Sequence, residues 1–207
     1  MISREFNAKK HYSWEYDSKN RFISYWYQTR EVLKTGPKKI LEIGIGNKTV
    51  TNYLKVQEIE VVTVDTEKDL NPDYVCGVTD IDKYFKENSV DTILCAEVLE
   101  HLPFENFETA LKKMHKITKN YTIISLPHFG INFRFSFKFP LIKEKNLLIK
   151  IPLPIAHKYD GEHYWEIGYK GYSLRKISKI FSKFFDIERE FLVPETPSHH
   201  FFVLRKK

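Results

Sequence analysis

The stretch Leu41-Glu42-Ile43-Gly44-Ile45-Gly46-Asn47-Lys48-Thr49 decides the fold of this chain of 207 residues. Its first half completes a short apolar run that begins at Lys39 and ends at a glycine, which is typical of a buried strand. Apolar residues at helical spacing follow from Val50. Gly44 permits a tight turn between the two elements, and Gly46 lets a ligand lie against bare backbone at the helix N-terminus. The stretch therefore predicts a strand, a ligand-binding loop and a helix in succession.

Strands and helices alternate from this loop onward. Strand patterns lie at 39–44, 59–65, 73–76, 90–95 and 121–126, with helical patterns between them at 49–54, 81–85 and 104–117. Such alternation predicts a parallel sheet covered by helices on both faces. After an insertion, a helix with Ser173 as N-cap precedes two strands, at 187–193 and 200–204, that only a turn separates, so these two must be antiparallel. The sequence predicts an α/β fold, a Rossmann-like three-layer sandwich with a mixed seven-stranded sheet whose last strand is antiparallel, plus an insertion after the fifth strand.

The length predicts a single domain over 1–207. Residues 1–35 form an aromatic-rich helical lead-in that we expect to pack on the core and, together with the insertion, to close the ligand site. Residues 129–168 form the insertion, in which Phe133, Phe135, Phe137 and Phe139 alternate with polar or basic residues. Two interpretations stay open: a hairpin or lid over the site with its apolar face buried, or a basic, aromatic surface within 129–158 that touches a membrane, an anionic lipid headgroup or RNA.

Composition and charge exclude several classes of protein. The longest stretch without a charged side chain, 120–133, is too short to cross a bilayer. The net charge of +6 comes from interspersed residues, which favours ordinary solubility over a nucleic-acid partner. The only two cysteines, Cys76 and Cys95, cannot form a disulfide framework or a zinc site. This use of cysteine favours a reducing, cytoplasmic compartment. Since no set of His, Cys, Asp and Glu residues has the spacing of metal ligands, we also expect no metal.

Asp65 narrows the choice of ligand for the glycine loop. It ends the second strand, where a carboxylate can accept both hydroxyls of a ribose. Thr49 stands where dinucleotide-binding sequences carry a third glycine, which serves close packing beside a pyrophosphate. The pattern thus predicts a nucleoside without a pyrophosphate and argues against NAD. The alternative is a simple glycine turn with Asp65 facing solvent.

Three segments together resemble the class I S-adenosylmethionine-dependent methyltransferases, and most closely their broad type 11 group, which includes many small-molecule methyltransferases. The segments are 41–46 (LEIGIG), Asp65, and 90–102 (VDTILCAEVLEHL). The resemblance covers 38–127, and the strand, helix and hairpin at the end of the chain agree with that family's seven-stranded sheet. It implies that S-adenosylmethionine is the cofactor.

The resemblance also implies a set of cofactor-binding residues along the carboxyl edge of the sheet. Residues of the glycine loop line the methionyl part, the end of the second strand holds the ribose and flanks the adenine, and the end of the fourth strand lies beside the sulfonium. The implied set is Glu42, Gly44, Gly46, Asp65, Thr66, Val78, Asp80, Cys95, Ala96 and Glu97.

Two positions depart from the family's pattern. Gly77 stands where many relatives carry an aspartate that accepts from the adenine amino group, so either Asp80 substitutes from a shifted loop or the backbone of Val78 acts alone. Lys48 stands where many relatives have glycine, and we expect little cost because a side chain at the start of a helix can point outward.

Methyl transfer is an in-line displacement on an activated carbon, so it needs a base only where the acceptor must lose a proton. His128 follows the fifth strand directly and is the favoured catalytic candidate. His163, beside Glu166 in a polar, aromatic loop, is the second, with loop packing as its alternative role. His101 is interpreted as a capping or orienting residue. The histidines expected to be structural or solvated are His115, His199 and His200.

The sequence thus predicts a methyltransferase that uses S-adenosylmethionine and acts on a small-molecule acceptor. Two alternatives stay open, an RNA or protein methyltransferase and a non-catalytic module that only binds S-adenosylmethionine. The pattern does not identify the acceptor, the methylated atom or the oligomeric state.

Overall fold

The computed structural model describes residues 12–141, 145–153 and 155–207. The strands are β1 (Lys39–Ile43), β2 (Glu60–Asp65), β3 (Tyr74–Val75), β4 (Val90–Ala96), β5 (Thr118–Pro127), β6 (Ile131–Phe137), β7 (Lys145–Ile151), β8 (Phe185–Leu192) and β9 (His199–Lys206). The α-helices are α2 (Lys19–Lys34), α3 (Thr49–Val56), α4 (Phe107–Ile117) and α5 (Leu174–Phe181). Short 3-10 helices lie at Lys68–Leu70, Ile81–Lys83, Leu99–His101 and Phe104–Asn106.

Seven of these strands form one mixed sheet in the order β3-β2-β1-β4-β5-β9-β8. Strands β1 to β5 all run parallel to one another, whereas β9 is antiparallel to both β5 and β8. The predicted mixed sheet with an antiparallel last strand is therefore confirmed. Because β1 lies between β2 and β4, the glycine loop after β1 opens at the point where the strand order reverses, which is where open α/β sheets bind ligands.

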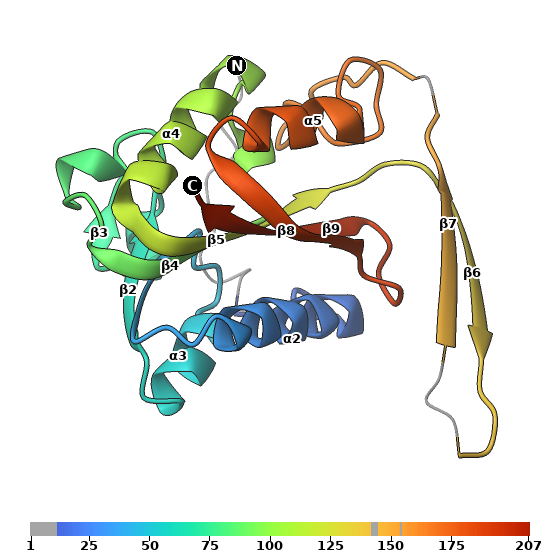
Figure 1. Cartoon of the computed structure of the whole chain (residues 1–207), viewed down its shortest axis with the longest axis horizontal. Helices are drawn as coiled ribbons and strands as arrows, with labels where there is room; N and C mark the ends of the chain where they lie inside the picture. Colours follow the sequence, from blue (N-terminus) through green and yellow to red (C-terminus); the bar gives the residue numbers. More distant parts are fainter. Residues whose placement is uncertain (1–11, 142–144, 154) are drawn as a thin grey trace.

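Helices cover both faces of the sheet, as the alternating pattern predicts. Helices α4 and α5 lie on one face, and α2 and α3 lie on the other (Figure 1). Each face has its own buried apolar cluster. One includes Phe107 and Met114 of α4 and Phe181 of α5, and the other includes Val32 of α2 and Leu54 of α3. In the part of the chain that the structure describes, no helix has both the length and the apolar character needed to span a membrane.

Two predicted helices are shorter than their patterns. The segment predicted at 81–85 is a single 3-10 turn, which still buries Ile81 and Phe85. The helix predicted from residue 104 begins with the 3-10 turn Phe104–Asn106, and α4 follows it. Apolar spacing marks which residues face the core, but it does not separate a 3-10 turn from the α-helix that continues it.

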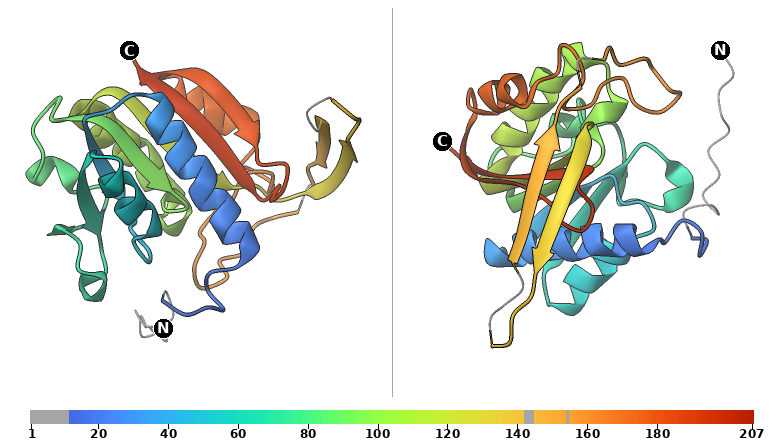
Figure 2. Two further views of the ribbon diagram at one scale, coloured as in Figure 1. Left: turned by 90° about the horizontal axis from the view of Figure 1, so that it is seen from below. Right: turned by 90° about the vertical axis from the view of Figure 1, so that its right-hand side faces the viewer.

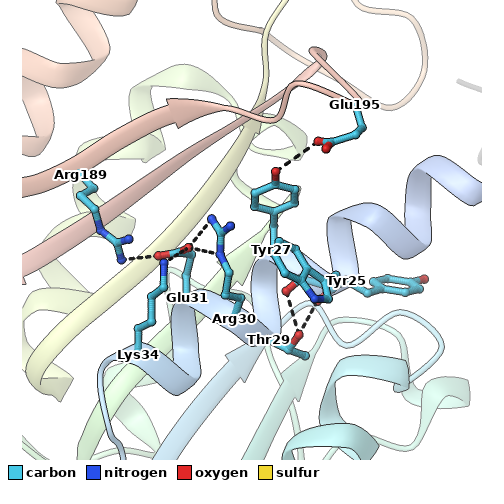
Figure 3. A network of polar contacts seen from close by, with 9 residues as sticks. Tyr25, Tyr27, Thr29, Arg30, Glu31, Lys34, Arg189 and Glu195 are labelled. Carbon is cyan, nitrogen blue, oxygen red and sulfur yellow. Dashed lines mark hydrogen bonds and ion pairs between the residues drawn. The ribbon is translucent and has the colours of Figure 1, made fainter. Parts of the chain in front are cut away.

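Most of the described part of the predicted lead-in is helix α2, which residues 12–18 precede. Residues 1–11 lie outside the described residues. Ser18 is the N-cap of α2 and accepts from the Arg21 amide at 3.3 Å. A fully buried carboxylate, Glu31, anchors the helix to β8 through an ion pair with Arg189 (Figure 3). The lead-in is only partly packed, however, because Trp14 is 85% exposed and Trp26 is 55% exposed.

The insertion contains an antiparallel hairpin, β6 paired with β7, that stands away from the domain (Figure 2). Phe133, Phe135 and Phe137 share one face with residues of β7 opposite them, and each is about half exposed. The contacts with the domain come instead from the other face, where Arg134 and Lys150 donate to the backbone carbonyls of Pro194 and Pro197. The expectation that the apolar face of this hairpin is buried is therefore wrong.

The insertion leaves and rejoins the domain at one place. His128 and Ile167 form an isolated parallel bridge, in which the Phe129 amide donates to the Ile167 carbonyl at 2.8 Å and the Ile167 amide donates to the Pro127 carbonyl at 3.0 Å. Close by, the indole of Trp165 is fully buried and donates to the Leu102 carbonyl at 3.1 Å. Trp165 and Ile167, rather than the hairpin, tie the insertion to the core.

Candidate active site

The glycine loop between β1 and α3 has the tight backbone that its sequence predicts. Gly44 and Gly46 both have positive φ, +79° and +47°. A Cβ on Gly44 would lie 2.3 Å from Cγ2 of Val98, so only glycine fits there. A Cβ on Gly46 would meet a single atom within 4 Å, the Tyr16 hydroxyl at 3.8 Å. Gly44 thus serves close packing, and Gly46 presents accessible backbone.

Asp65 lies directly beside this loop, at the end of β2. One carboxylate oxygen accepts from the Ile45 amide at 2.9 Å, and the other accepts from the Glu67 amide at 2.9 Å. Asp65 is half-buried, so it braces the loop and stays partly accessible. Each carboxylate oxygen has two lone pairs, which leaves acceptor capacity for hydroxyl groups of a ligand.

The segment before α2, part of the aromatic N-terminal segment expected to close the site, contacts the glycine loop. The Asn47 amide nitrogen donates to Asp17 at 2.7 Å, and the guanidinium of Arg21 stacks on the Tyr16 ring at 3.8 Å. Burial raises the pKa of Tyr16, and Asp65 is among the charges that raise it further. Tyr16 therefore belongs to the same crevice. No local motif marks it, because the contact joins distant parts of the chain.

Glu42 lies beneath the loop rather than at its surface. Its side chain is buried and accepts from the Thr51 hydroxyl at 2.5 Å. Burial raises its pKa to about 7, and the nearby Asp65 acts in the same direction. The carboxyl group thus supports the loop from inside, at the start of α3.

The loop after β2 and β3 holds the residues that the resemblance assigns to the adenine. Thr66 is exposed and Val78 is buried. Asp80 ends a turn in which its amide donates to the Gly77 carbonyl at 2.9 Å, and its carboxylate pairs with Lys83 at 2.5 Å. Of the two alternatives for the missing aspartate, Asp80 has a cationic partner in Lys83, and the choice between it and the Val78 backbone stays open.

At the end of β4 the three predicted residues differ in exposure. Cys95 is fully buried in the core, and this burial raises the pKa of its thiol. Its side chain therefore faces away from the crevice, while Ala96 is half-buried. Glu97 has a positive φ of 53° and accepts from the Ser125 hydroxyl at 2.8 Å. Glu97 is the residue of this group that presents a polar side chain at the sheet edge.

A cavity of about 370 Å³ opens next to Glu97, at the carboxyl ends of β4 and β5. Most of its lining residues carry polar side chains, and several belong to the base of the insertion. Both predicted catalytic histidines, His128 and His163, line it. The other lining residues are Pro127, Phe129, Gly130, Asn132, Glu166, Ser198 and His199. His199, expected to be structural or solvated, is thus part of this wall.

His128 lies at the inner wall, in contact with a second histidine. Its Nδ1 is 2.8 Å from Nδ1 of His200, whose Nε2 lies 3.5 Å from a carboxylate oxygen of Glu190. Burial lowers the pKa of His128 to about 3, with the Lys150 ammonium and His200 acting in the same direction. His128 is therefore a neutral imidazole at physiological pH.

His163 is held differently. Its Nδ1 lies 2.7 Å from a carboxylate oxygen of Glu166, and this hydrogen bond raises the pKa of His163 despite its burial. The ring of His101 packs edge-on against it, with 4.9 Å between ring centroids. His101 in turn faces the Glu162 carbonyl through Nδ1 at 2.9 Å. His101 thus links its own turn to the loop that carries His163.

Comparison with known proteins gives a consistent family. Residues 41–125 match the family model described as a methyltransferase domain. No curated protein matches the chain.

Similar solved structures extend the likeness to nearly the whole chain. An S-adenosylmethionine-dependent methyltransferase from Clostridium acetobutylicum ATCC 824 has 10% identity and a TM-score of 0.62, covering 97% of this chain and 99% of that one. The 1,6-didemethyltoxoflavin-N1-methyltransferase of Burkholderia thailandensis, with bound 1,6-didemethyltoxoflavin and S-adenosylhomocysteine, has 16% identity and a TM-score of 0.56, covering 91% and 86%. The N-methyltransferase NodS of Bradyrhizobium japonicum WM9, in complex with S-adenosylhomocysteine, has 12% identity and a TM-score of 0.59, covering 92% and 89%.

At these identities the solved structures establish the fold. The matched methyltransferase domain contains the glycine loop, Asp65 and Glu97, all at the carboxyl edge of that fold. Residues 41–125 therefore match a methyltransferase domain, and the whole chain has the fold of S-adenosylmethionine-dependent methyltransferases.

Proposed function

We propose that this protein binds S-adenosylmethionine over the glycine loop and Asp65, and transfers its methyl group to a small molecule in the adjacent cavity. The observation that carries the proposal is the half-buried carboxylate of Asp65, hydrogen-bonded to the loop amide of Ile45 at 2.9 Å. A carboxylate able to accept from ribose hydroxyls thus lies beside accessible glycine backbone, which supports the proposal.

The residues of this edge fit a nucleoside with a short charged tail. Asp65 is positioned for the ribose hydroxyls, and the open backbone at Gly46 leaves room for the tail. The Tyr16 hydroxyl lies near Gly46, 3.8 Å from the place of a Cβ, so Tyr16 can also contact the tail. When bound, S-adenosylmethionine supplies a methyl group on a sulfonium, which is already activated for displacement.

The cavity has the size of a small-molecule site. Its volume of about 370 Å³ lies within the range of ligand pockets. Glu97, His128 and His163 bring polar atoms to it from three separate segments, so the wall can orient an acceptor by hydrogen bonds. Since the displacement itself needs mainly correct placement, orientation is the main contribution that these side chains make.

Calorimetric titration with S-adenosylhomocysteine tests the cofactor site. We expect Asp65→Ala to weaken binding tenfold or more, because it removes the ribose acceptor and the brace on Ile45. The matched control is Asp69→Ala, which removes an exposed carboxylate from the neighbouring 3-10 turn and should leave affinity unchanged. Unchanged affinity in Asp65→Ala would refute the assignment.

The acceptor is tested with methyl-labelled S-adenosylmethionine and a cell extract divided into small-molecule and macromolecular fractions. Label in the small-molecule fraction supports the proposal, and label only in the macromolecular fraction favours an RNA or protein acceptor. Intact cofactor affinity without any labelled product would favour a module that only binds the cofactor.

A further inference from the structure

The fold brings together a carboxylate and two imidazoles beside the acceptor cavity. Glu100 and His101 belong to the 3-10 turn after β4, and His163 belongs to the insertion. One ligand-type atom from each of the three lies within 4.8 Å of the others. The Tyr164 amide donates to the Glu100 carbonyl at 2.8 Å, which fixes the two segments against each other.

Glu100 is unusual because its carboxylate is fully buried and has no hydrogen-bond partner. Its side chain has no exposed surface, and among the described residues neither carboxylate oxygen has a donor within hydrogen-bond distance. The nearest cationic candidate is Nε2 of His101, 4.0 Å from one oxygen. Buried polar atoms are nearly always hydrogen-bonded or bound to an ion, so an unpartnered carboxyl group whose oxygen lies within 4.8 Å of two imidazoles is a candidate ligand for a cation.

Both imidazoles already use their Nδ1 atoms elsewhere. Nδ1 of His101 faces the Glu162 carbonyl, which can only accept, so this nitrogen carries the proton. Nδ1 of His163 faces the carboxylate of Glu166 in the same way. Each ring is thereby left with Nε2 as the nitrogen that can bind a cation. A histidine whose other nitrogen donates to a carboxylate or a carbonyl is the usual arrangement of a metal ligand.

We propose that Glu100, His101 and His163 bind one divalent transition-metal cation. Two imidazole nitrogens and a carboxylate oxygen suit Zn²⁺, Co²⁺ or Mn²⁺ better than Ca²⁺ or Mg²⁺. This proposal departs from the sequence-based expectation of no metal, which considered only spacing along the chain. It does not depend on the cofactor.

The position of this site relates the cation to the acceptor. His163 is part of the wall of the cavity, and His101 is exposed, so the cluster is open on one side. Three protein ligands leave a coordination position for a further oxygen or nitrogen. The cation therefore lies where an acceptor oxygen can complete its coordination.

Cation binding is measured on the full-length protein after treatment with a chelator. We expect calorimetry to give one equivalent of Zn²⁺ per chain, Co²⁺ to give visible absorption bands of a nitrogen- and oxygen-ligated ion, and Mg²⁺ to bind more weakly. Co²⁺ should also raise the melting temperature of the wild type, since a ligand of the folded state stabilises it.

Variants identify the ligands. His101→Ala and His163→Ala should each weaken Co²⁺ binding by roughly a hundredfold, because loss of even a supporting hydrogen-bond partner costs about 10–100-fold. Glu100→Gln keeps the shape of the buried side chain and removes its charge, with the same expected loss. His115→Ala, which removes a half-buried histidine of α4, should leave binding unchanged. His157→Ala tests the neighbouring group of His157, Asp160 and Glu166 and should also leave it unchanged.

The outcomes separate this proposal from its rivals. A wild type that binds none of these cations, or His101→Ala and His163→Ala variants that bind as well as the wild type, would overturn it. Loss in His157→Ala but not in His101→Ala would move the site to the other group. If Glu100→Gln fails to fold, the melting temperatures of His101→Ala with and without Co²⁺ decide the question. S-adenosylhomocysteine affinity without metal should be unchanged in His101→Ala, so the cofactor site can stand or fall separately.

Discussion

At the scale of single residues, Glu42 is a carboxylic acid enclosed beneath the glycine loop. Burial raises its pKa to about 7 in the folded protein, whereas an unfolded glutamate titrates near about 4.3. The stabilisation that follows from this raised pKa is fully present below about pH 4 and is lost as pH rises through 7. Loss of the proton from buried Glu42 thus lowers the free energy of unfolding at alkaline pH.

We expect the free energy of unfolding to fall by on the order of 2–4 kcal/mol between pH 5 and pH 8 through this group alone. Glu42→Gln imitates the protonated acid and can still accept from Thr51, so it should match the wild type at pH 5 and exceed it at pH 8. Urea unfolding at the two pH values measures this, with the exposed Glu105→Gln as control. A Glu42→Gln variant as pH-dependent as the wild type would contradict the assignment.

Gly44 illustrates a residue fixed by two constraints at once, its positive φ and the methyl group of Val98 at the place of a Cβ. Gly44→Ala should lower the free energy of unfolding by about 2–4 kcal/mol, from backbone strain plus overpacking. Gly36→Ala is the matched control, because Gly36 also has positive φ but has nothing within 4 Å of a Cβ. Its cost should be only about 1 kcal/mol.

The double variant Gly44→Ala with Val98→Ala should recover part of that loss, since the colliding Cγ2 is gone. If urea unfolding gave the same loss of free energy of unfolding for Gly44→Ala and Gly36→Ala, the Val98 side chain would be able to move aside at no energetic cost.

At the scale of elements, helix α2 is joined to the sheet through one buried carboxylate. Glu31 has no exposed surface and pairs with Arg30 at 2.5 Å, with Lys34 at 3.2 Å, and with Arg189 of β8 (Figure 3). Three cations around one buried charge compensate its desolvation, and the pair with Arg189 is a polar contact between the helix and the antiparallel end of the sheet.

Glu31→Ala should destabilise the protein by roughly 1–3 kcal/mol, because the three cations lose their partner while keeping some access to water. The comparison is Glu188→Ala, an exposed carboxylate on β8 that bonds only the Tyr121 hydroxyl in the described structure and should cost below about 1 kcal/mol. Thermal unfolding at low and moderate salt measures both. Equal small losses would show that α2 is held by its apolar contacts alone.

Elements whose patterns depend on neighbours in the chain could be predicted from the sequence. β1 and β4 are short, largely apolar segments that end at the same edge of the sheet, and Ser173 caps α5 as expected. The hairpin shows where this stops. Alternation correctly puts Phe133 and Phe135 on one face, but it carries no information on whether that face meets the domain or solvent.

At the scale of the whole molecule, the sequence could predict which residues lie at the carboxyl edge of the sheet, because each of them directly follows the end of a predicted strand. The sequence could not predict groups that meet only through tertiary contacts. Tyr16 reaches the glycine loop from before α2, and His163 reaches His101 from beyond the hairpin. Spacing rules for metal sites assume that the ligands lie on one local segment. They therefore do not detect the cluster of Glu100, His101 and His163, which joins the 3-10 turn after β4 to the insertion.

The paired ends of the insertion have a consequence for how such a protein can diverge. Because His128 and Ile167 are bridged, everything between them begins and ends at a single point of the scaffold. Such a module can be exchanged, shortened or extended while the strands beneath keep their register. Under the proposed function, exchange of this module would change the acceptor while the residues of the glycine loop and Asp65 stay the same.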